Sequence, residues 1–394
     1  MKKFLIAALL PLLFCYAADA AKIRTTPSGI LTYTESTDQG DISITFKRCM
    51  ANNLYTFYEV KLDGITVNSA QHSDNISPFA VNGYWMGGNH NDVTTKKPTA
   101  NTVSFKIKVD EEPVTPPKTV EGKVLVIDVE NELFYSDGKK FATEYMSYIV
   151  SGNSIEVYAE HVFEYPSTMT VSRYYGAQSM FVPTEILLPG KNTTWTSSNV
   201  DAIDVYKSEA PAFSTFIERS SLGYQAVLKF ADGLGDAGRI AQSDQVYLWR
   251  KYGSSGKSYH VMLWDSPVAN KETTLWHALY TWFKKPVTDT FDGAASEPVF
   301  EYQTTIEGQP VVMSVSADGK STDLSGIDDI VVDNIAPVAS AGHGKITISD
   351  SAPEARCFDL SGKLIHTGTG TFTCPAGVYI VNDMQGHSVK LIVK

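Results

Sequence analysis

The chain has 394 residues, of which 43% are hydrophobic, a size and composition that predict two or three folded domains rather than a disordered chain. Its formal net charge is -11, which argues against nucleic acid as a partner because phosphate binding requires clustered Lys and Arg. After the first twenty residues, no segment is long and apolar enough to predict a transmembrane helix.

The N-terminal end has the pattern of a secretory signal peptide. Two lysines precede an apolar run at 4–16, and Ala18-Asp-Ala20 matches a small-residue cleavage site. The apolar run is too short to span a bilayer as a stable helix. We therefore expect residues 1–20 to be removed and the rest of the chain to be exported.

The remaining sequence reads almost entirely as β-strands. Short runs rich in β-branched and aromatic residues are separated by Gly, Asn, Asp and Pro, which is typical of strands joined by turns. Strands are expected at 29–36, 42–48, 54–61, 102–109, 124–130, 145–150, 155–164, 168–175, 225–230 and 259–264. The sequence lacks a βαβ rhythm and a glycine-rich phosphate loop, so a nucleotide-binding α/β fold is not expected.

One segment fits two structures equally well. Residues 273–285 carry Leu275, Leu279 and Trp282 at helical spacing, and Pro286 follows where a helix would end. The same segment is rich in threonine and aromatic residues, which favour a strand. Both alternatives remain open from the sequence.

We predict an all-β fold, a large antiparallel two-sheet sandwich followed by a small C-terminal β-sandwich. The main domain is expected at 21–317, with an alternative subdivision near 286–298, and a polar linker at 318–337 leads to the C-terminal domain at 338–394. The proline-rich stretch 112–119 is interpreted as an extended loop inside the main domain. Enlarged sandwiches of this kind occur in carbohydrate-active enzymes and lectins, an analogy at the level of fold alone.

The densest group of unusual residues lies between Tyr84 and Asp92. Gly87-Gly88 permits unusual backbone angles, and a run of polar side chains around His90 follows two aromatic residues. Sugar rings stack on aromatic faces, and their hydroxyls need amide and carboxylate partners. The candidate substrate-binding residues are Tyr84, Trp85, Asn89, Asn91 and Asp92. The alternative is a polar turn in which Asn and Asp satisfy backbone groups.

Histidines on separate strands allow a metal-site hypothesis. Strict alternation puts His161 on the apolar face of its strand, where it is either a packed core residue or an inward-facing ligand. His260 shares a face with Met262 and Trp264 and has the same two interpretations. His90, His161 and His260 together would suit a divalent metal, zinc or calcium, although no short ligand spacing supports one.

The enzymatic hypothesis is a polysaccharide lyase or a related glycan-cleaving enzyme. A lyase needs a base, an acid and a group that neutralises the uronate carboxylate. His90 is the candidate base, Tyr174 or Tyr224 the acid, and Arg173 or Asn89 the neutralising group. A glycosidase is less favoured because nothing in the sequence pairs two carboxylates. The alternatives are a non-catalytic glycan-binding module or adhesin that uses Tyr84, Trp85 and Trp249, and a structural surface protein.

The last fifty residues carry a recognisable combination of segments. These are Ile346-Thr-Ile-Ser, Asp359-Leu-Ser-Gly-Lys, Pro375-Ala-Gly-Val-Tyr-Ile-Val and a terminal Lys390-Leu-Ile-Val-Lys. The combination resembles the type A C-terminal sorting domain of Bacteroidetes proteins exported by the type IX secretion system. The resemblance implies that the secretion machinery is a partner and that the protein is secreted or held on the outer-membrane surface of a Gram-negative bacterium.

Two cysteines fall within this C-terminal stretch. Cys357 and Cys374 lie on consecutive strand-like segments, so a disulfide between them is a further expectation in an oxidising compartment. Cys49 would then be unpaired and buried.

Overall fold

The computed structural model describes the residues in the following ranges: 20–49, 51–69, 78–88, 90–92, 94–164, 169–179, 185–188, 193–196, 202–206, 215–230, 246–251, 257–268, 273–291, 299–316, 321–323, 339–342, 345–348, 355–359, 364–375, 377–382 and 388–393. These residues form strands and turns, with no helix among them. The chain divides into two compact units, Met1–Ser325 and Gly326–Lys394.

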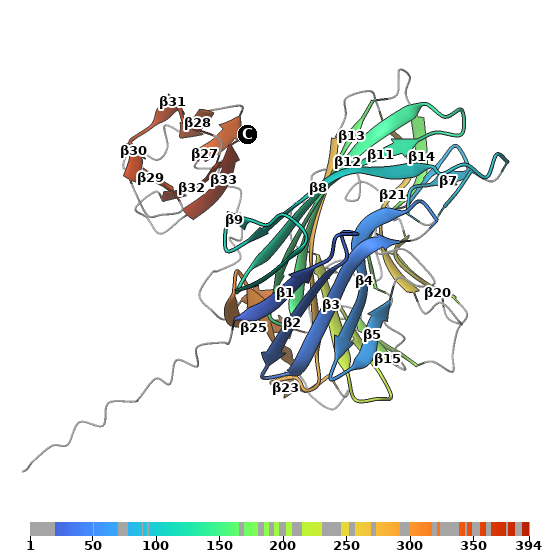
Figure 1. Ribbon diagram of the computed structural model, residues 1–394, viewed down its shortest axis with the longest axis horizontal. Coiled ribbons are helices and arrows are strands. Elements are labelled where there is room, and N and C mark those ends of the chain that lie inside the picture. The colour runs from blue at the N-terminus through green and yellow to red at the C-terminus, as the bar shows by residue number, and fades with distance from the viewer. Residues whose placement is uncertain are drawn as a thin grey trace, which may run out of the picture. The chain divides into compact units, whose positions relative to one another are not determined.

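The first unit is organised around one large antiparallel sheet, called the large sheet below (Figure 1). From one edge to the other, its strands are β16 (Thr193–Thr196), β15 (Glu185–Leu188), β18 (Thr215–Arg219), β19 (Gln225–Phe230), β22 (Thr273–Phe283), β13 (Ser154–Phe163), β12 (Lys140–Ser151), β11 (Leu125–Phe134), β8 (Ala100–Val109) and β9 (Glu112–Pro113).

Two smaller sheets share the core on one face of the large sheet. The N-terminal sheet contains β10 (Lys118–Gly122), β1 (Ala21–Thr25), β2 (Leu31–Thr37), β3 (Gly40–Cys49), β4 (Leu54–Leu62) and β5 (Ile65–Ser69). The β14 sheet contains β17 (Ala202–Tyr206), β20 (Val246–Lys251), β21 (Lys257–Val268), β14 (Met169–Ser179), β6 (Phe79–Val81) and β7 (Tyr84–Met86). One layer of the sandwich is therefore built from two sheets.

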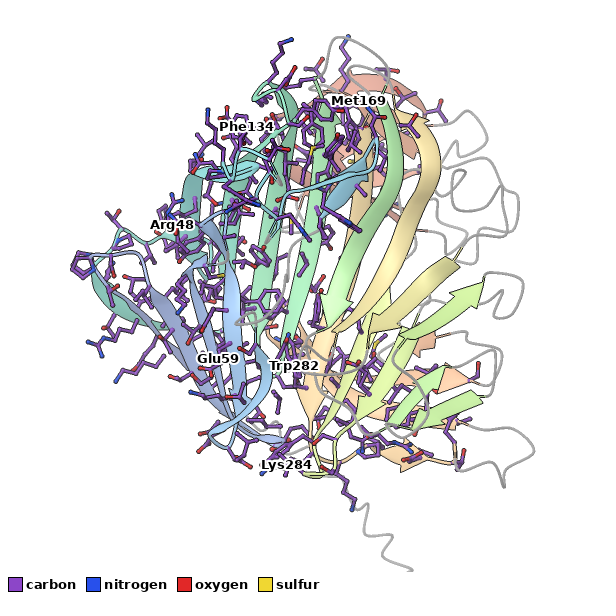
Figure 2. All side chains as sticks on the ribbon, turned by 90° about the vertical axis from the view of Figure 1, so that its right-hand side faces the viewer. Arg48, Glu59, Phe134, Met169, Trp282 and Lys284 are labelled. Atoms are coloured by element: carbon purple, nitrogen blue, oxygen red, sulfur yellow. The ribbon has the colours of Figure 1, made fainter. Side chains whose placement is uncertain are left out.

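The main core lies between these layers. Phe57 of β4 makes edge contacts with Tyr148 of β12 and with Trp282 of β22, at ring-centroid distances of 5.9 and 6.4 Å. Figure 2 shows the side chains that fill the space between the blue N-terminal sheet and the green strands of the large sheet. Aromatic pairs of this kind contribute about 0.5–1.5 kcal/mol each beyond the apolar area that they bury.

A fourth sheet, the small sheet, packs on the other face of the large sheet, which we call the outer face. It contains β23 (Thr288–Asp289), β24 (Val299–Ile306), β25 (Gln309–Ser316) and β26 (Ser321–Asp323). The ring of Phe283 in β22 stacks on Tyr302 in β24 at 5.6 Å. In the β24–β25 turn, Glu307 and Gly308 both have left-handed backbone angles, and a Cβ on the glycine would lie 3.2 Å from the side chain of Val124, the residue before β11. The turn is therefore held close against the large sheet.

The predicted all-β sandwich is confirmed, and each expected strand overlaps a strand of the structure. The ambiguous segment at 273–285 is the strand β22, which is paired on both sides, with β13 and with β19. A strand in this central position buries residues on both faces, so its apolar residues do not alternate cleanly. The stretch 112–119 was expected to be an extended loop, but short strands occupy both of its ends.

The second unit is a smaller β-structure with its own core. One sheet contains β27 (Ala339–Gly342), β28 (Lys345–Ile348) and β31 (Gly370–Thr373), and the other contains β30 (Leu364–Thr367), β29 (Arg356–Asp359), β32 (Gly377–Asn382) and β33 (Ser388–Val393). Cys357 and Cys374 are both buried in this core as free thiols. Burial, with a smaller contribution from Cys374, raises the pKa of the Cys357 thiol to about 11. Since both thiols are free, the expected disulfide is not formed in this structure.

Candidate functional site

The candidate loop begins at the β6–β7 hairpin. Its two-residue turn, Asn82-Gly83, has positive φ angles of 48° and 84°, the geometry that favours these residue types in tight hairpins. Trp85 lies opposite Ala80 in this hairpin, and its ring stacks on that of His90 with centroids 5.2 Å apart and planes 22° apart. Both rings are partly exposed, and Tyr84 beside them is 44% exposed.

A buried amide fixes the backbone of this loop. Gly87 and Gly88 turn the chain with φ angles of 72° and 48°. The side-chain amide of Asn52 donates to the carbonyl oxygens of Gly88 (2.8 Å) and His90 (2.9 Å), and its oxygen accepts from the N–H of Thr99 at 2.9 Å. Because the Asn52 side chain is buried and uses both of its polar atoms, it holds the position from which the His90 ring projects.

The acidic residue at the end of the loop has a structural role. Oδ1 of Asp92 accepts hydrogen bonds from the backbone N–H groups of Thr94 and Thr95, and the residue is 7% exposed. The hydrogen bond from the Thr95 backbone is the main cause that holds the pKa of the Asp92 carboxyl below its usual range. Asn91, by contrast, is exposed and forms an isolated bridge with Pro98. Asn89 lies outside the described residues.

His161 is a buried core residue with a carboxylate partner. Its Nε2 lies 2.7 Å from Oε2 of Glu144, and neither side chain is exposed to solvent. The other oxygen of Glu144 accepts from the Asn131 amide at 2.7 Å, and the oxygen of Asn131 accepts from the Thr102 hydroxyl at 2.6 Å. The ring of Phe79 packs against the imidazole at 4.9 Å. This chain of hydrogen bonds crosses β13, β12, β11 and β8 inside the core.

The structure does not bring His90 and His161 together. Phe79 contacts His161 from the core side of β6, whereas the neighbouring position, Ala80, lies opposite Trp85, which stacks on His90. Since successive side chains of a strand point to opposite faces, the two histidines lie on opposite sides of the hairpin. The side chain of His260 is outside the described part of the chain, and among the described residues no group of His, Cys, Asp and Glu is arranged to hold a metal.

The remaining candidates of the lyase hypothesis are placed only in part. Arg173 and Tyr174 belong to β14 and pair with Ala80 and Phe79 of β6, but their side chains lie outside the described residues. Tyr224 is partly buried against the main core, in the turn before β19. Trp249 belongs to β20, and its side chain is also not described.

A second cluster, which no sequence pattern indicated, lies on the outer face of the large sheet. Nε2 of His277 lies 3.1 Å from Oε2 of Glu156, and the Tyr158 hydroxyl donates to the same oxygen at 3.3 Å. The Tyr158 and His277 rings stack with centroids 3.9 Å apart and planes 7° apart. Alternation along β13 places Glu156 and Tyr158 on one face. Their histidine partner is in β22, the segment whose secondary structure was ambiguous.

Comparisons with known proteins leave the family open. No family model and no curated protein matches the sequence. The galactosidase domain of the alpha-galactosidase-sucrose kinase AgaSK is similar over 66% of this chain and 42% of its own, with 9% identity and a TM-score of 0.42. The alpha-galactosidase AgaB from Geobacillus stearothermophilus is similar over 67% of this chain and 41% of its own, with 8% identity and a TM-score of 0.38.

A third similar structure is a putative mutarotase, YeaD, from Salmonella typhimurium. It has 10% identity and a TM-score of 0.32, over 68% of this chain and 94% of its own. The matches to the two galactosidase structures span less than half of those chains. At these identities and TM-scores, the similarities assign no activity to this chain. In the part of the chain that the structure describes, no helix has the length and hydropathy needed to cross a membrane.

Proposed function

We propose that this protein binds complex carbohydrate through the loop that follows the β6–β7 hairpin. The observation that carries the proposal is the stacked pair of Trp85 and His90, partly exposed beside Tyr84 on a loop whose backbone is fixed from within. An aromatic ring offers its face to the C–H groups of a sugar, while nearby amides and imidazoles bond to the hydroxyls.

The fixed geometry of the loop favours binding. When a ligand immobilises an exposed tryptophan that samples several rotamers, the lost conformational entropy weakens binding. The cost is about 0.5–1.5 kcal/mol for each such side chain. Stacking on His90 restricts the indole of Trp85 before any ligand arrives, and Asn52 restricts the backbone of His90. The exposed amide of Asn91 lies in the same loop and supplies both donors and an acceptor for hydroxyl groups.

The test is a binding assay with the full mature chain and a panel of host and plant polysaccharides. We expect Trp85→Ala to weaken binding to the responding polysaccharide at least tenfold while leaving the melting temperature nearly unchanged. The matched control is Tyr58→Ala, which removes an aromatic ring from the N-terminal sheet, where the Lys47 ammonium lies 3.4 Å above it. Equal affinity for the Trp85→Ala variant and the wild type, or no binding across the panel, would refute the proposal.

A finer version of the proposal is glycan cleavage by a lyase with His90 as the base. It is supported by the partial exposure of His90 and by Arg173, which pairs with the same Ala80 that pairs with Trp85. Incubation with uronate-containing polysaccharides tests it directly. Unsaturated uronate products that disappear in His90→Ala, with the fold intact, would support a lyase. Binding without new chain ends would leave a non-catalytic glycan-binding protein.

We further propose that the protein acts outside the cell. The support is in the sequence, namely the signal-like residues 1–20 and the resemblance of 345–394 to a type IX sorting domain. Expression in a Bacteroidetes host, with and without residues 345–394, tests both parts. The full chain should reach the cell surface or the medium, whereas the truncated chain should accumulate in the periplasm. Export of both forms to the same extent would refute a sorting role for the C-terminal region.

A further inference from the structure

The outer face of the large sheet carries a second set of groups that are suited to a polar ligand. Glu156 is 8% exposed, yet both hydrogen bonds that reach it end on the same oxygen, Oε2. Its other oxygen, Oε1, has no hydrogen-bond donor among the described residues. Oε1 is not among the fully buried side-chain atoms that have no partner, so it is open to solvent, and a ligand hydroxyl can take the place of water as its donor.

The cluster is partly accessible to solvent. The His277 side chain is 24% exposed and Tyr158 is partly exposed. Tyr145, on the same face of the neighbouring strand β12, is 44% exposed. On the other side the small sheet begins, and the carboxylate of its turn residue Glu307 acts electrostatically on the Tyr158 hydroxyl. The cluster therefore lies at the border between the covered and the open parts of the outer face.

The side chains at this border are polar and aromatic. Directly across the strands from Tyr158 lies Ser147, whose small hydroxyl donates to Asp128 at 2.9 Å. A serine beside a tyrosine ring leaves that ring face less covered than a large neighbour would. The stacked His277 fixes the ring from the opposite side. This arrangement combines an aromatic face, a hydroxyl oxygen and a carboxylate oxygen, and both oxygens can accept from a ligand hydroxyl within one stretch of sheet.

The charge around the cluster selects among polar ligands. The carboxylates of Glu156 and Glu307 act electrostatically on the Tyr158 hydroxyl, and Glu160 follows on the same face of β13. The positive side chain of Lys229 lies in register with Glu156, beyond Leu279. An anionic ligand such as a uronate would be repelled, and in a partly desolvated site this repulsion is only weakly screened. A neutral ligand with several hydroxyl groups fits the donors and acceptors without such a cost.

We propose that Glu156, Tyr158 and His277 form a binding site for a neutral sugar unit, separate from the loop that carries Trp85. The open oxygen of Glu156 accepts a hydrogen bond from a ligand hydroxyl, and Tyr158 supplies the aromatic face. The site does not depend on the loop, because its residues come from the centre of the large sheet, in β13 and β22.

The test uses the full chain with histidine labelled at the Cε1 position and follows the ring signals by NMR during titration. The probes are glucose, galactose, mannose and N-acetylglucosamine, with galacturonate as the anionic probe. His277→Gln assigns the His277 signal. We expect at least one neutral sugar to shift this signal in a saturable way, and galacturonate to bind at least tenfold more weakly.

Matched variants separate binding from folding. Glu156→Gln is nearly isosteric and should weaken the response about tenfold or more, which corresponds to about 1.4 kcal/mol. Tyr158→Phe keeps the aromatic face and should retain most of the response, whereas Tyr158→Leu removes the face and should weaken it about tenfold or more. Glu121→Gln removes an exposed carboxylate from β10 and should change nothing. Trp85→Ala should also leave the His277 response intact, so that failure of the loop proposal and failure of this one are distinguishable. No shift of His277 with any neutral sugar, or equal shifts in the Glu156→Gln variant, would overturn the proposal.

Discussion

Strand β13 contributes one residue to each of two histidine–glutamate pairs, which lie on opposite faces of the large sheet. The two pairs have the same chemical groups but differ in burial and in hydrogen bonding. On the core face, His161 and Glu144 lie 2.7 Å apart with no exposed surface. On the outer face, His277 and Glu156 lie 3.1 Å apart with 24% and 11% of their side chains exposed. In the core pair, both carboxylate oxygens have partners, whereas in the outer pair one oxygen carries both contacts.

This difference indicates different roles. A fully buried pair with saturated hydrogen bonds has no atom left for a ligand, and removing one partner leaves a polar group stranded in the core. A partly exposed pair with an open carboxylate oxygen has both access and unused hydrogen-bonding capacity. We therefore infer that the His161–Glu144 pair stabilises the core and that the His277–Glu156 pair binds a ligand.

The largest effect should come from breaking the buried pair. His161→Ala leaves the Glu144 carboxylate in the core without its partner, and we expect a loss of about 3–5 kcal/mol in the free energy of unfolding. All six tryptophans lie before residue 326, so tryptophan fluorescence during urea denaturation reports on the first unit alone. A loss below 1 kcal/mol would contradict a structural role for the pair.

A smaller effect should come from replacing the histidine on the outer face. His277→Gln removes a partly exposed partner, and pairs of this kind contribute about 0–1 kcal/mol. We expect the urea midpoint to stay close to that of the wild type, while the affinity for the neutral sugar, measured by titration calorimetry, falls about tenfold or more. A destabilisation as large as that of His161→Ala would show that the two pairs have the same role and would remove the distinction between them.

The smallest effect concerns Asp92, a charged group held by hydrogen bonds within its own turn. Because the folded-state pKa of Asp92 is lowered, its contribution to stability is present above the unfolded pKa, about 3.9, and is lost as the pH falls through the folded value. Asp92→Asn keeps the acceptor oxygen but does not titrate. The stability difference between wild type and variant should therefore be present at neutral pH and disappear at strongly acidic pH. A difference that is independent of pH would contradict this account.

Local sequence patterns predicted part of this organisation. Alternation along 155–163 assigned His161 to the core face, and the spacing of aromatic residues and glycines identified the loop of Trp85 and His90, whose rings do stack. Both features depend on residues close together in the chain.

The outer-face cluster could not be predicted in the same way. Its geometry depends on the register that pairs Tyr158 with His277, residues that are more than a hundred positions apart in the sequence. The register is set by packing of the whole large sheet, in which β22 has neighbours on both sides. The buried chain from His161 to Thr102 likewise crosses four strands, and no short motif marks its members.

The most direct test of the two roles is deuterium exchange at the Cε1 position of each histidine, measured by mass spectrometry with and without a neutral oligosaccharide that binds the protein. We predict that His277 exchanges in the free protein and is slowed by the sugar, whereas His161 does not exchange until the first unit unfolds. Exchange of His161 as fast as that of His277, or a rate at His277 that the sugar leaves unchanged, would contradict the assignment.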